Sequence, residues 1–580
     1  MKTSLNFLFI LFIAVLMQCN QPAKGQISWQ PFTPQNLQNA AKQNKPLILH
    51  LAANWCHWCH VMEEKTYQNP QVVSYIQKNF IACREDHDQR PDLANKYREY
   101  GWPATIIFDP QGNEIFKQAG YIEANEFLEI LKKIKSGQIK YKPSASSFTT
   151  NDTILRSKFQ ILTQGILEQI DTIKGGFDFF QKSVNYQMFE YAFNHQKQAV
   201  FKKWLNITMQ NSLHLLDTVW GGYYQYSTYG EWTNPHYEKL LSIQARYVKM
   251  NLWYFYVSDD SALFHAAIKT YQYCKRFLKQ PDALYANAQD ADLIPGKKAH
   301  DYFRLPDKAR LKKGIPHIDT NTYTANNARW AESIIWLYAF TGDSTYLNEA
   351  LEIAQILIKK RQRPDGFYNH GSDNDLTPAL DVQLAIANLL LNLSQITGNN
   401  QYVNQLAALL SKIKNKFYDG QCLLSFLPLK NYISPGCILE ENIEAARLFN
   451  IYGHMSGNME FIEFAKKLQQ YLMSTFVKVD EFKEPSLLTL QEELNKEPYH
   501  ALLLLKQNTS ENLSLPLWQI PSFYLIKKTA VSKQQLNENQ KEYWEFFDSN
   551  TYLFCTNSFC SPPIYDPSQL KNFFYDKLLR

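Results

Sequence analysis

The sequence predicts a multidomain chain in which a small α/β domain precedes a much larger all-α domain. Up to about residue 138, short apolar runs alternate with segments of helical periodicity. Beyond a polar linker, apolar residues recur at helical spacing through most of the remaining chain. A length of 580 residues with 45% hydrophobic residues suits two domains that each bury a core.

The predicted organisation has five parts. They are a leader at 1–25, an α/β domain at 26–138, a linker at 139–155, a helical domain at 156–530 and a C-terminal tail at 531–580. The net charge of +5 comes from 60 basic and 55 acidic residues spread evenly along the chain. Such a balance does not indicate nucleic acid as a partner. We expect no cofactor.

The elements of the first domain follow from local patterns. The run 47–53 is continuously apolar, as a buried strand is, and prolines stand at two helix starts. In order, we predict a helix at 35–44, a strand at 47–53, a helix opening with a cysteine pair, a helix at 70–80, a strand at 80–83, a helix at 91–100, a strand at 104–108, a hairpin strand at 114–118 and a helix at 124–134. Strands and helices that alternate and end in a hairpin and a helix indicate the thioredoxin fold.

The most informative motif is Cys56-His-Trp-Cys59, which lies between the apolar strand and the next helix. Two cysteines at this spacing in this position form a thioredoxin-type redox pair. Unpaired N–H groups at the helix start favour the thiolate of Cys56, and Cys59 lies one turn further, where it resolves a mixed disulfide. This hypothesis requires the sulfur of Cys56 to be accessible.

Gly101-Trp102-Pro103 supports the same fold. A proline at the head of a strand that faces the cysteines is where thioredoxin-like proteins keep a cis peptide bond, and cis bonds are essentially confined to X-Pro. Pro103 would shape the substrate groove, and Trp102 is a candidate substrate contact. A plain turn proline is the alternative.

Two histidines are candidates for proton transfer. His50 lies six residues before the first cysteine, where many thioredoxins place a buried acid, and either moves protons or only satisfies a local hydrogen bond. His57 is expected to lower the pKa of the first thiol. The alternative is a metal site at the cysteine pair, completed by Cys83 or His87.

Taken together, Cys56-His-Trp-Cys-His-Val-Met-Glu63, Arg90-Pro91-Asp92 and Gly101-Trp-Pro103 resemble the spermatogenesis-associated protein 20 family. The resemblance extends into the helical region at Trp220-Gly-Gly-Tyr223 and Pro235-His-Tyr-Glu-Lys239. It implies a thioredoxin-like domain joined to an (α/α)6 toroid.

The helical region itself predicts hairpins. Helices expected at 326–340 and 344–361, for example, are joined by Gly342-Asp343. A weak repeat of glycine followed by aromatic residues recurs, as in Gly175-Gly-Phe177, and these aromatics are expected to line a shared mouth. The length available fits a closed ring of helical hairpins, as in six-hairpin glycosidases and sugar epimerases. A superhelical solenoid is the second choice.

Several side chains of this region have the chemistry for a carbohydrate site. Tryptophans suit stacking on sugars, while carboxylates and histidines suit acid–base work, and His236 with His370 would supply the two bases of an epimerase. The alternative is that these groups hold loops and helix ends. The candidate substrate-binding residues are Trp220, Trp232, His236, Glu238, Asp290, Asp292, Asn327, His370 and Asp381.

The N-terminus reads as a secretory leader, with Lys2 followed by a short apolar run. Ala23-Lys24-Gly25 has the form of an ordinary cleavage site, whereas Leu16-Met-Gln-Cys19 resembles a lipobox, in which Cys19 would carry lipid. We therefore expect a periplasmic or membrane-anchored protein on the extracytoplasmic side, with membrane contact only through that lipid.

The pair Cys555 and Cys560 forms either a small-loop disulfide or a relay partner of the first pair. Three functional hypotheses follow. The first is a thiol–disulfide oxidoreductase with a protein dithiol or disulfide substrate. The second is a carbohydrate-binding or carbohydrate-active toroid with a small-molecule ligand and an auxiliary thioredoxin-like domain. The third is a scaffold without turnover.

Overall fold

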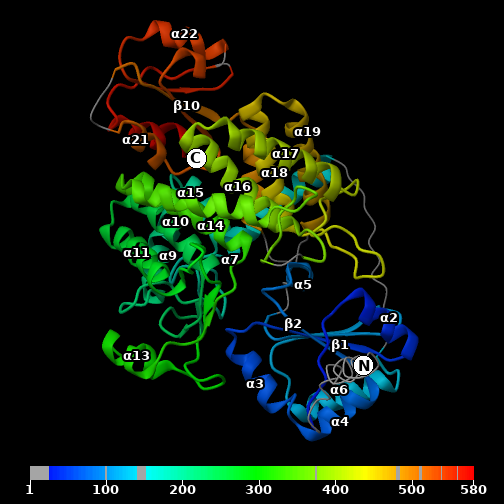
Figure 1. Cartoon of the computed structure of the whole chain (residues 1–580). Coiled ribbons are helices and arrows are strands. Elements are labelled where there is room, and N and C mark those ends of the chain that lie inside the picture. The colour runs from blue at the N-terminus through cyan, green and yellow to red at the C-terminus, as the bar shows by residue number, and fades with distance from the viewer. Residues whose placement is uncertain are drawn as a thin grey trace, which may run out of the picture. The chain divides into compact units, whose positions relative to one another are not determined.

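The structure, a computed structural model, describes residues 25–97, 101–139, 152–372, 375–477, 484–507, 512–536, 538–557 and 559–579. These residues form two compact units, both drawn in Figure 1. The division departs from the predicted boundaries at two short segments. Residues 88–97 group with the second unit, although they lie within the predicted first domain, and residues 430–433 group with the first unit.

The first unit is built on one four-stranded sheet in the order β2-β1-β3-β4. β1 pairs parallel with β2 and antiparallel with β3, and β3 pairs antiparallel with β4. The strands are β1 (Leu47–Ala52), β2 (Ile81–Asp86), β3 (Ala104–Phe108) and β4 (Glu114–Ala119), and the helices are α2 (Pro34–Gln43), α3 (His57–Lys65), α4 (Pro70–Asn79) and α6 (Ala124–Lys135). This arrangement confirms the predicted thioredoxin-like fold.

The core of this unit explains why α4 and α6 lie together (Figure 1). Both helices bury one apolar stripe, represented by Ile76 and Phe127. These stripes share a cluster with Ile48 of β1 and Ile107 of β3. The register places Ile48 opposite Ile107, so both side chains lie on the same face of the sheet. The sheet thereby holds the end of β1 in place, and the cysteine motif follows it directly.

The second unit is a ring of helical hairpins, which confirms the predicted (α/α)6 toroid. Among the described residues, six inner helices contact one another in sequence, and the last contacts the first. The inner helices are α8 (Tyr186–Asn194), α10 (Leu241–Ser258), α14 (Thr324–Thr341), α16 (Leu380–Thr397), α18 (Leu439–Ser456) and α20 (Pro485–Leu494). Their outer partners are α9 (Ala199–Ser212), α11 (Ser261–Tyr273), α15 (Ser344–Arg361), α17 (Asn400–Phe417), α19 (Met459–Phe476) and α7 (Asp152–Gln169).

Inner and outer helices differ in burial. The inner helix α14 buries twelve of its 18 residues, whereas its outer partner α15 buries six. The turn between them is short because Gly342 ends α14 in the left-handed conformation and Asp343 immediately caps α15 through the backbone N–H of Thr345. The predicted helical hairpins therefore form as expected.

A repeated amide contact fixes the return from an outer helix to the next inner helix at four places in the ring. In α14, the side-chain oxygen of Asn327 accepts from the backbone N–H of Tyr285, and its nitrogen donates to the carbonyls of Tyr285 and Tyr323. The fourth residue of three further inner helices makes the same contacts: Gln244, Gln383 and Asn442. We call this contact the amide clamp.

The aromatic residues of the glycine repeat do not line a mouth, which corrects that expectation. Phe177, Tyr223 and Tyr368 are buried in the core of the second unit, each in a β-bridge that closes its turn. The repeat is therefore structural. Its glycines allow the tight turn, since Gly222 has a φ of 75° and a Cβ there would collide with the ring of Tyr273.

The remaining elements extend the ring. Short pieces of the second unit are α5 (Pro91–Lys96), β5 (Tyr226–Ser227), β6 (Pro235–His236), β7 (Lys239–Leu240), β8 (Ala288–Gln289), α12 (His300–Phe303), α13 (Asp307–Lys313) and β9 (Ile318–Asp319). No described helix combines the length and the apolar composition that a membrane span requires.

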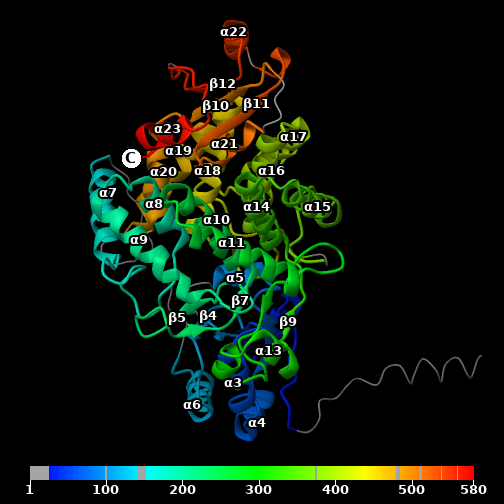
Figure 2. The same cartoon turned by 90° about the vertical axis from the view of Figure 1, so that its left-hand side faces the viewer.

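The C-terminal region is more ordered than a tail. A three-stranded sheet in the order β11-β10-β12 spans the predicted boundary at residue 530 (Figure 2). Its parts are β10 (Tyr499–Leu504), α21 (Ser514–Gln519), β11 (Leu525–Ala530), α22 (Glu538–Phe546), β12 (Thr551–Cys555) and α23 (Gln569–Phe573). The central strand β10 carries four consecutive buried residues, so the sheet has its own core.

Candidate functional site

The cysteine pair lies at the start of α3. Cys56 is the residue immediately before the helix, and its sulfur accepts a hydrogen bond from the backbone N–H of Cys59 at 3.2 Å. The two sulfurs are joined in a disulfide. When the pair is reduced, the same N–H and the positive end of the helix dipole favour a thiolate on Cys56. The local geometry is therefore that of a dithiol–disulfide couple.

The two cysteines differ slightly in their exposed fractions, and both fractions are small. Cys56 is 5% exposed and Cys59 is 1% exposed. Both cysteines are therefore buried, and the accessibility that the redox hypothesis requires is limited to the small residual exposure of Cys56. The side chain of Trp58, between the two cysteines, is 43% exposed.

The Trp102–Pro103 peptide bond is cis. Pro103 is buried and begins the segment that leads into β3. The ring of Trp102 packs edge-on against Trp55, with centroids 5.3 Å apart, and against His87 at 4.9 Å. The indole N–H of Trp102 is buried and has no hydrogen-bond acceptor among the described residues.

His50 lies in the middle of β1 and is completely buried. Its Nδ1 is 3.3 Å from the hydroxyl of Tyr67. Burial, assisted by the positive charge of Arg84, lowers the pKa of His50 to about 3. The imidazole is therefore neutral and a weak base near neutral pH, which favours the local hydrogen-bonding role over proton transfer.

The side chains named for the alternative metal site make other contacts. His57 follows Cys56 in α3, and its ring contacts that of Trp58 at 5.3 Å. The thiol of Cys83 points to the carbonyl oxygen of Pro31 at 3.6 Å. Among the described residues, no group of three or more histidines, cysteines or carboxylates is placed to hold a metal ion.

In the second unit, the two predicted stacking tryptophans are buried structural residues. The indole N–H of Trp220 donates to Asp307 at 2.7 Å, and that of Trp232 donates to the carbonyl of Lys174 at 2.7 Å. Neither ring is placed to stack on a sugar.

Four predicted residues gather at one place near β6 and β8. His236 stacks on Tyr226 with centroids 4.4 Å apart, and its Nδ1 is 4.0 Å from Glu238. Burial, together with the nearby charges of Asp290 and Asp292, raises the pKa of Glu238 to about 8. Hydrogen bonds from the backbone N–H groups of Asp292 and Gly296 show that both aspartates also shape their own loop.

The other three predicted residues have separate roles. Asn327 forms an amide clamp and is fully buried, so it is structural. His370 stacks on Tyr323, and its Nε2 is 2.6 Å from the carbonyl oxygen of Asp88. Asp381, in the first turn of α16, lines a cavity.

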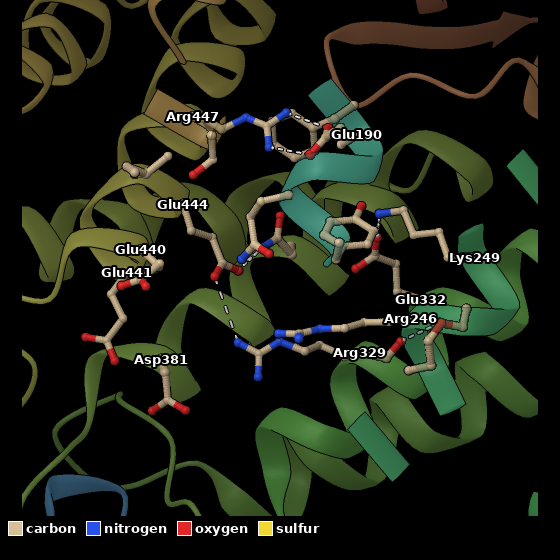
Figure 3. A pocket seen from close by; sticks show the side chains of 18 of the residues that line it. Glu190, Arg246, Lys249, Arg329, Glu332, Asp381, Glu440, Glu441, Glu444 and Arg447 are labelled. Carbon is tan, nitrogen blue, oxygen red and sulfur yellow. Dashed lines mark hydrogen bonds and ion pairs between the residues drawn. The ribbon is translucent and has the colours of Figure 1, made fainter. Parts of the chain in front are cut away.

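That cavity has a volume of about 290 Å³, and all six inner helices contribute to its wall. We call it the ring cavity. Figure 3 shows its charged residues, with the carboxylates of Asp381, Glu440 and Glu441 on one side. Neither His236 nor His370 lines it, so the predicted epimerase pair does not meet there.

Sequence reasoning missed most of the ring cavity. Its charged lining residues are Glu190, Arg246, Lys249, Arg329, Glu332, Asp381, Glu440, Glu441, Glu444 and Arg447. A signal existed: Arg246 and Lys249, like Arg329 and Glu332, are three residues apart in otherwise apolar helices. Burial of Glu444, with the charges of Glu332 and Asp381 adding to it, raises the pKa of Glu444 above its ordinary value.

Two more disulfides lie in the second unit. Cys555 is joined to Cys560, and Cys422 is joined to Cys437, a pair that the sequence analysis did not single out. Cys19 and the leader lie outside the described residues.

Comparison with known proteins supports the predicted resemblance. A family model named Thioredox_DsbH, described as a protein of unknown function, DUF255, matches residues 16–157. Spermatogenesis-associated protein 20 of Rattus norvegicus is 25% identical over 315 residues, which are 47% of this chain and 40% of the rat protein. The match thus spans less than half of that relative's length. The resemblance to the spermatogenesis-associated protein 20 family is confirmed.

A shorter match and a solved structure complete the comparison. The thiol:disulfide interchange protein DsbD of Yersinia pestis is 31% identical over 98 residues, which are 16% of each chain. A sugar epimerase from a ruminal bacterium aligns in structure with a TM-score of 0.47 at 14% identity and covers 59% of this chain and 98% of its own.

Proposed function

We propose that this chain is an exported thioredoxin-like thiol–disulfide oxidoreductase whose reacting groups are Cys56 and Cys59. One observation carries the proposal: Cys56 precedes the first turn of α3, where its sulfur accepts a backbone hydrogen bond and is within bonding distance of the second sulfur. The match to a thiol:disulfide interchange protein over 98 residues adds support.

The exchange proceeds in two balanced steps. The Cys56 thiolate attacks one sulfur of a substrate disulfide, which forms a mixed disulfide and releases the other substrate sulfur as a thiolate. Cys59, once deprotonated, then attacks the sulfur of Cys56 and releases the second substrate thiolate. The substrate disulfide is reduced and the Cys56–Cys59 disulfide forms. In the opposite direction, the same steps oxidise a substrate dithiol.

The test uses the full chain and a trapped intermediate. Cys59→Ser should accumulate a mixed disulfide with a model disulfide substrate such as insulin, because the resolving sulfur is missing. Cys56→Ser should form none. Cys274→Ser is the matched control, since Cys274 is a buried free cysteine of the second unit. Equal insulin reduction by wild type and Cys56→Ser would refute the proposal.

Export is the second part of the proposal. It rests on the apolar run after Lys2 and on the two exit signals, Ala23-Lys24-Gly25 and Cys19. Expression in a bacterial host with mass spectrometry of the mature N-terminus distinguishes them. Ordinary cleavage leaves a new N-terminus after this small-residue signal, whereas lipidation leaves an acylated Cys19. An intact N-terminus in the cytoplasm would exclude export.

The second candidate function is carbohydrate binding by the toroid, with the thioredoxin-like unit as an auxiliary part. The ring cavity favours it because all six inner helices build it and its wall combines polar and apolar surface in about equal parts. A glycan array with full-length protein tests this candidate, with Asp381→Asn as the variant that should lose binding.

A further inference from the structure

Most basic groups of the ring cavity are already paired with carboxylates, and its wall carries six carboxylates against four basic groups. Basic side chains of three inner helices each pair with a carboxylate of the same wall. The pairs are Lys249 with Glu332 at 2.7 Å, Arg447 with Glu190 at 2.7 Å and Arg329 with Glu444 at 3.9 Å. An anionic ligand would have to compete with the carboxylates of these pairs for their basic groups. A neutral ligand enters without breaking them.

Two polar groups of the same wall remain without a protein partner. Oδ1 of Asp381 and the side-chain nitrogen of Asn95 both have almost no exposed surface and no hydrogen-bond partner among the described residues. One group is an acceptor and the other is a donor. Buried polar groups without partners are rare and call for a specific cause, such as a missing ligand.

We propose that the ring cavity binds a small, neutral, polyhydroxylated ligand of monosaccharide size through Asp381 and Asn95. A hydroxyl both donates and accepts hydrogen bonds, so a ligand with several hydroxyls can donate to the carboxylate oxygen and accept from the amide N–H. The rings of Tyr186 and Phe523 in the same wall offer apolar surface to the C–H groups of such a ligand. The inference rests on the second candidate function and gives it a site.

Asn95 reaches the cavity because its segment is held within the second unit. It lies in α5, which follows Asp88. The side-chain nitrogen of Asn287 donates to the carboxylate of Asp88 at 2.7 Å, and Nε2 of His370 is 2.6 Å from its carbonyl oxygen. Lys96 donates to the carbonyl of Ser434 at 3.1 Å. These contacts hold the chain just before α5 and the last residue of α5.

The test is isothermal titration of the full-length protein with D-glucose, D-mannose and D-galactose, and with putrescine as a cationic probe. The wild type should bind at least one hexose saturably. Asp381→Asn and Asn95→Asp should each weaken that binding roughly tenfold or more, because each removes one hydrogen bond to the ligand and leaves a mismatched group. Asn95→Asp decides the matter if Asp381→Asn does not fold.

Two control variants separate this inference from the redox proposal. Glu463→Gln neutralises an exposed carboxylate of α19 and should leave hexose binding unchanged. Cys56→Ser should also bind as the wild type does, whatever its redox activity. Absence of saturable hexose binding, binding of putrescine alone, or hexose binding that is equal in all variants would overturn the inference.

Discussion

His50 and Cys56 are six residues apart, yet their surroundings favour a neutral side chain at the first and a negative one at the second. Complete burial and the positive charge of Arg84 keep the His50 imidazole neutral. The helix start beside Cys56 instead favours a negative sulfur. Of the two roles that the sequence allows for His50, its contact with Tyr67 favours the structural one, and the reactivity of the pair then depends on backbone groups.

The pKa of His50 predicts a pH dependence of stability. The unfolded chain has the ordinary histidine pKa of about 6.5 and the folded chain about 3, so the unfolded state binds more protons between these values. The free energy of unfolding is unaffected above pH 6.5 and falls as pH drops toward 3. At pH 5 the loss from this group is about 2 kcal/mol.

Denaturant unfolding of wild type and His50→Leu at pH 7 and pH 5 measures this loss in the free energy of unfolding. The wild type should lose about 2 kcal/mol more than the variant over that interval, because the variant has no imidazole to protonate. Equal losses in both proteins would show that His50 does not carry the dependence.

Asp217 carries a second prediction at this scale. Its carboxylate is buried between Lys239 at 2.7 Å and Arg310 at 2.6 Å. Although burial opposes ionisation, the two cations hold the pKa of Asp217 at about 2. Asp217→Ala would leave two buried cations without their partner, and we expect a loss of about 4 kcal/mol in the free energy of unfolding.

Chemical denaturation compares this variant with Asp259→Ala. Asp259 pairs with Lys571 at 2.8 Å but is largely exposed, so its loss should cost less than about 1 kcal/mol. Similar losses in the two variants would mean that the buried pair contributes no more than a surface pair.

At the scale of elements, the amide clamps make one hairpin depend on the next. Each clamp fixes the turn after an outer helix to the fourth residue of the following inner helix, as Gln383 does for Tyr368. The sequence displays glycine–aromatic repeats, but it does not display their partners, because a turn and its amide are fifteen or more residues apart. From the sequence alone, Asn327 is therefore predicted as a ligand contact, whereas the structure gives it a structural role.

Asn327→Ala tests the clamp. The change removes three hydrogen bonds and leaves the buried backbone N–H and carbonyl of Tyr285 without the amide, so we expect a loss of about 3 kcal/mol. Asn415→Ala in α17 is the control, since Asn415 is exposed. The midpoint of thermal unfolding should fall clearly for the first variant and hardly for the second. A drop of the same size in both would argue against the clamp.

At the scale of the whole molecule, local patterns predicted both fold classes. The apolar run at 47–53 became β1, and the turn at Gly342 joined α14 to α15, because burial and turn formation act within a few residues. The ring cavity and the grouping of residues 88–97 with the second unit escaped prediction. Both depend on residues brought together from distant parts of the chain, which no local pattern records.

The three disulfides should differ in reactivity. Reduction of Cys56–Cys59 releases a thiolate that the start of α3 stabilises, so this bond should open before Cys422–Cys437. Limited dithiothreitol treatment, alkylation and peptide mass spectrometry measure the order. Cys274 is the internal control, because its buried thiol should stay unlabelled until unfolding. Earlier labelling of Cys422 would contradict the prediction.

The grouping of residues 88–97 matters to anyone who wishes to dissect this protein into independently expressed pieces. A fragment starting at residue 145 would omit α5, so Asn287 and His370 would lose the acceptors that Asp88 provides. The complementary N-terminal fragment would carry α5 but not Asn287, His370 and Ser434, which bind its segment. A clean cut in the linker therefore yields two incomplete halves, and biochemical work on either function is best done with the uncut polypeptide.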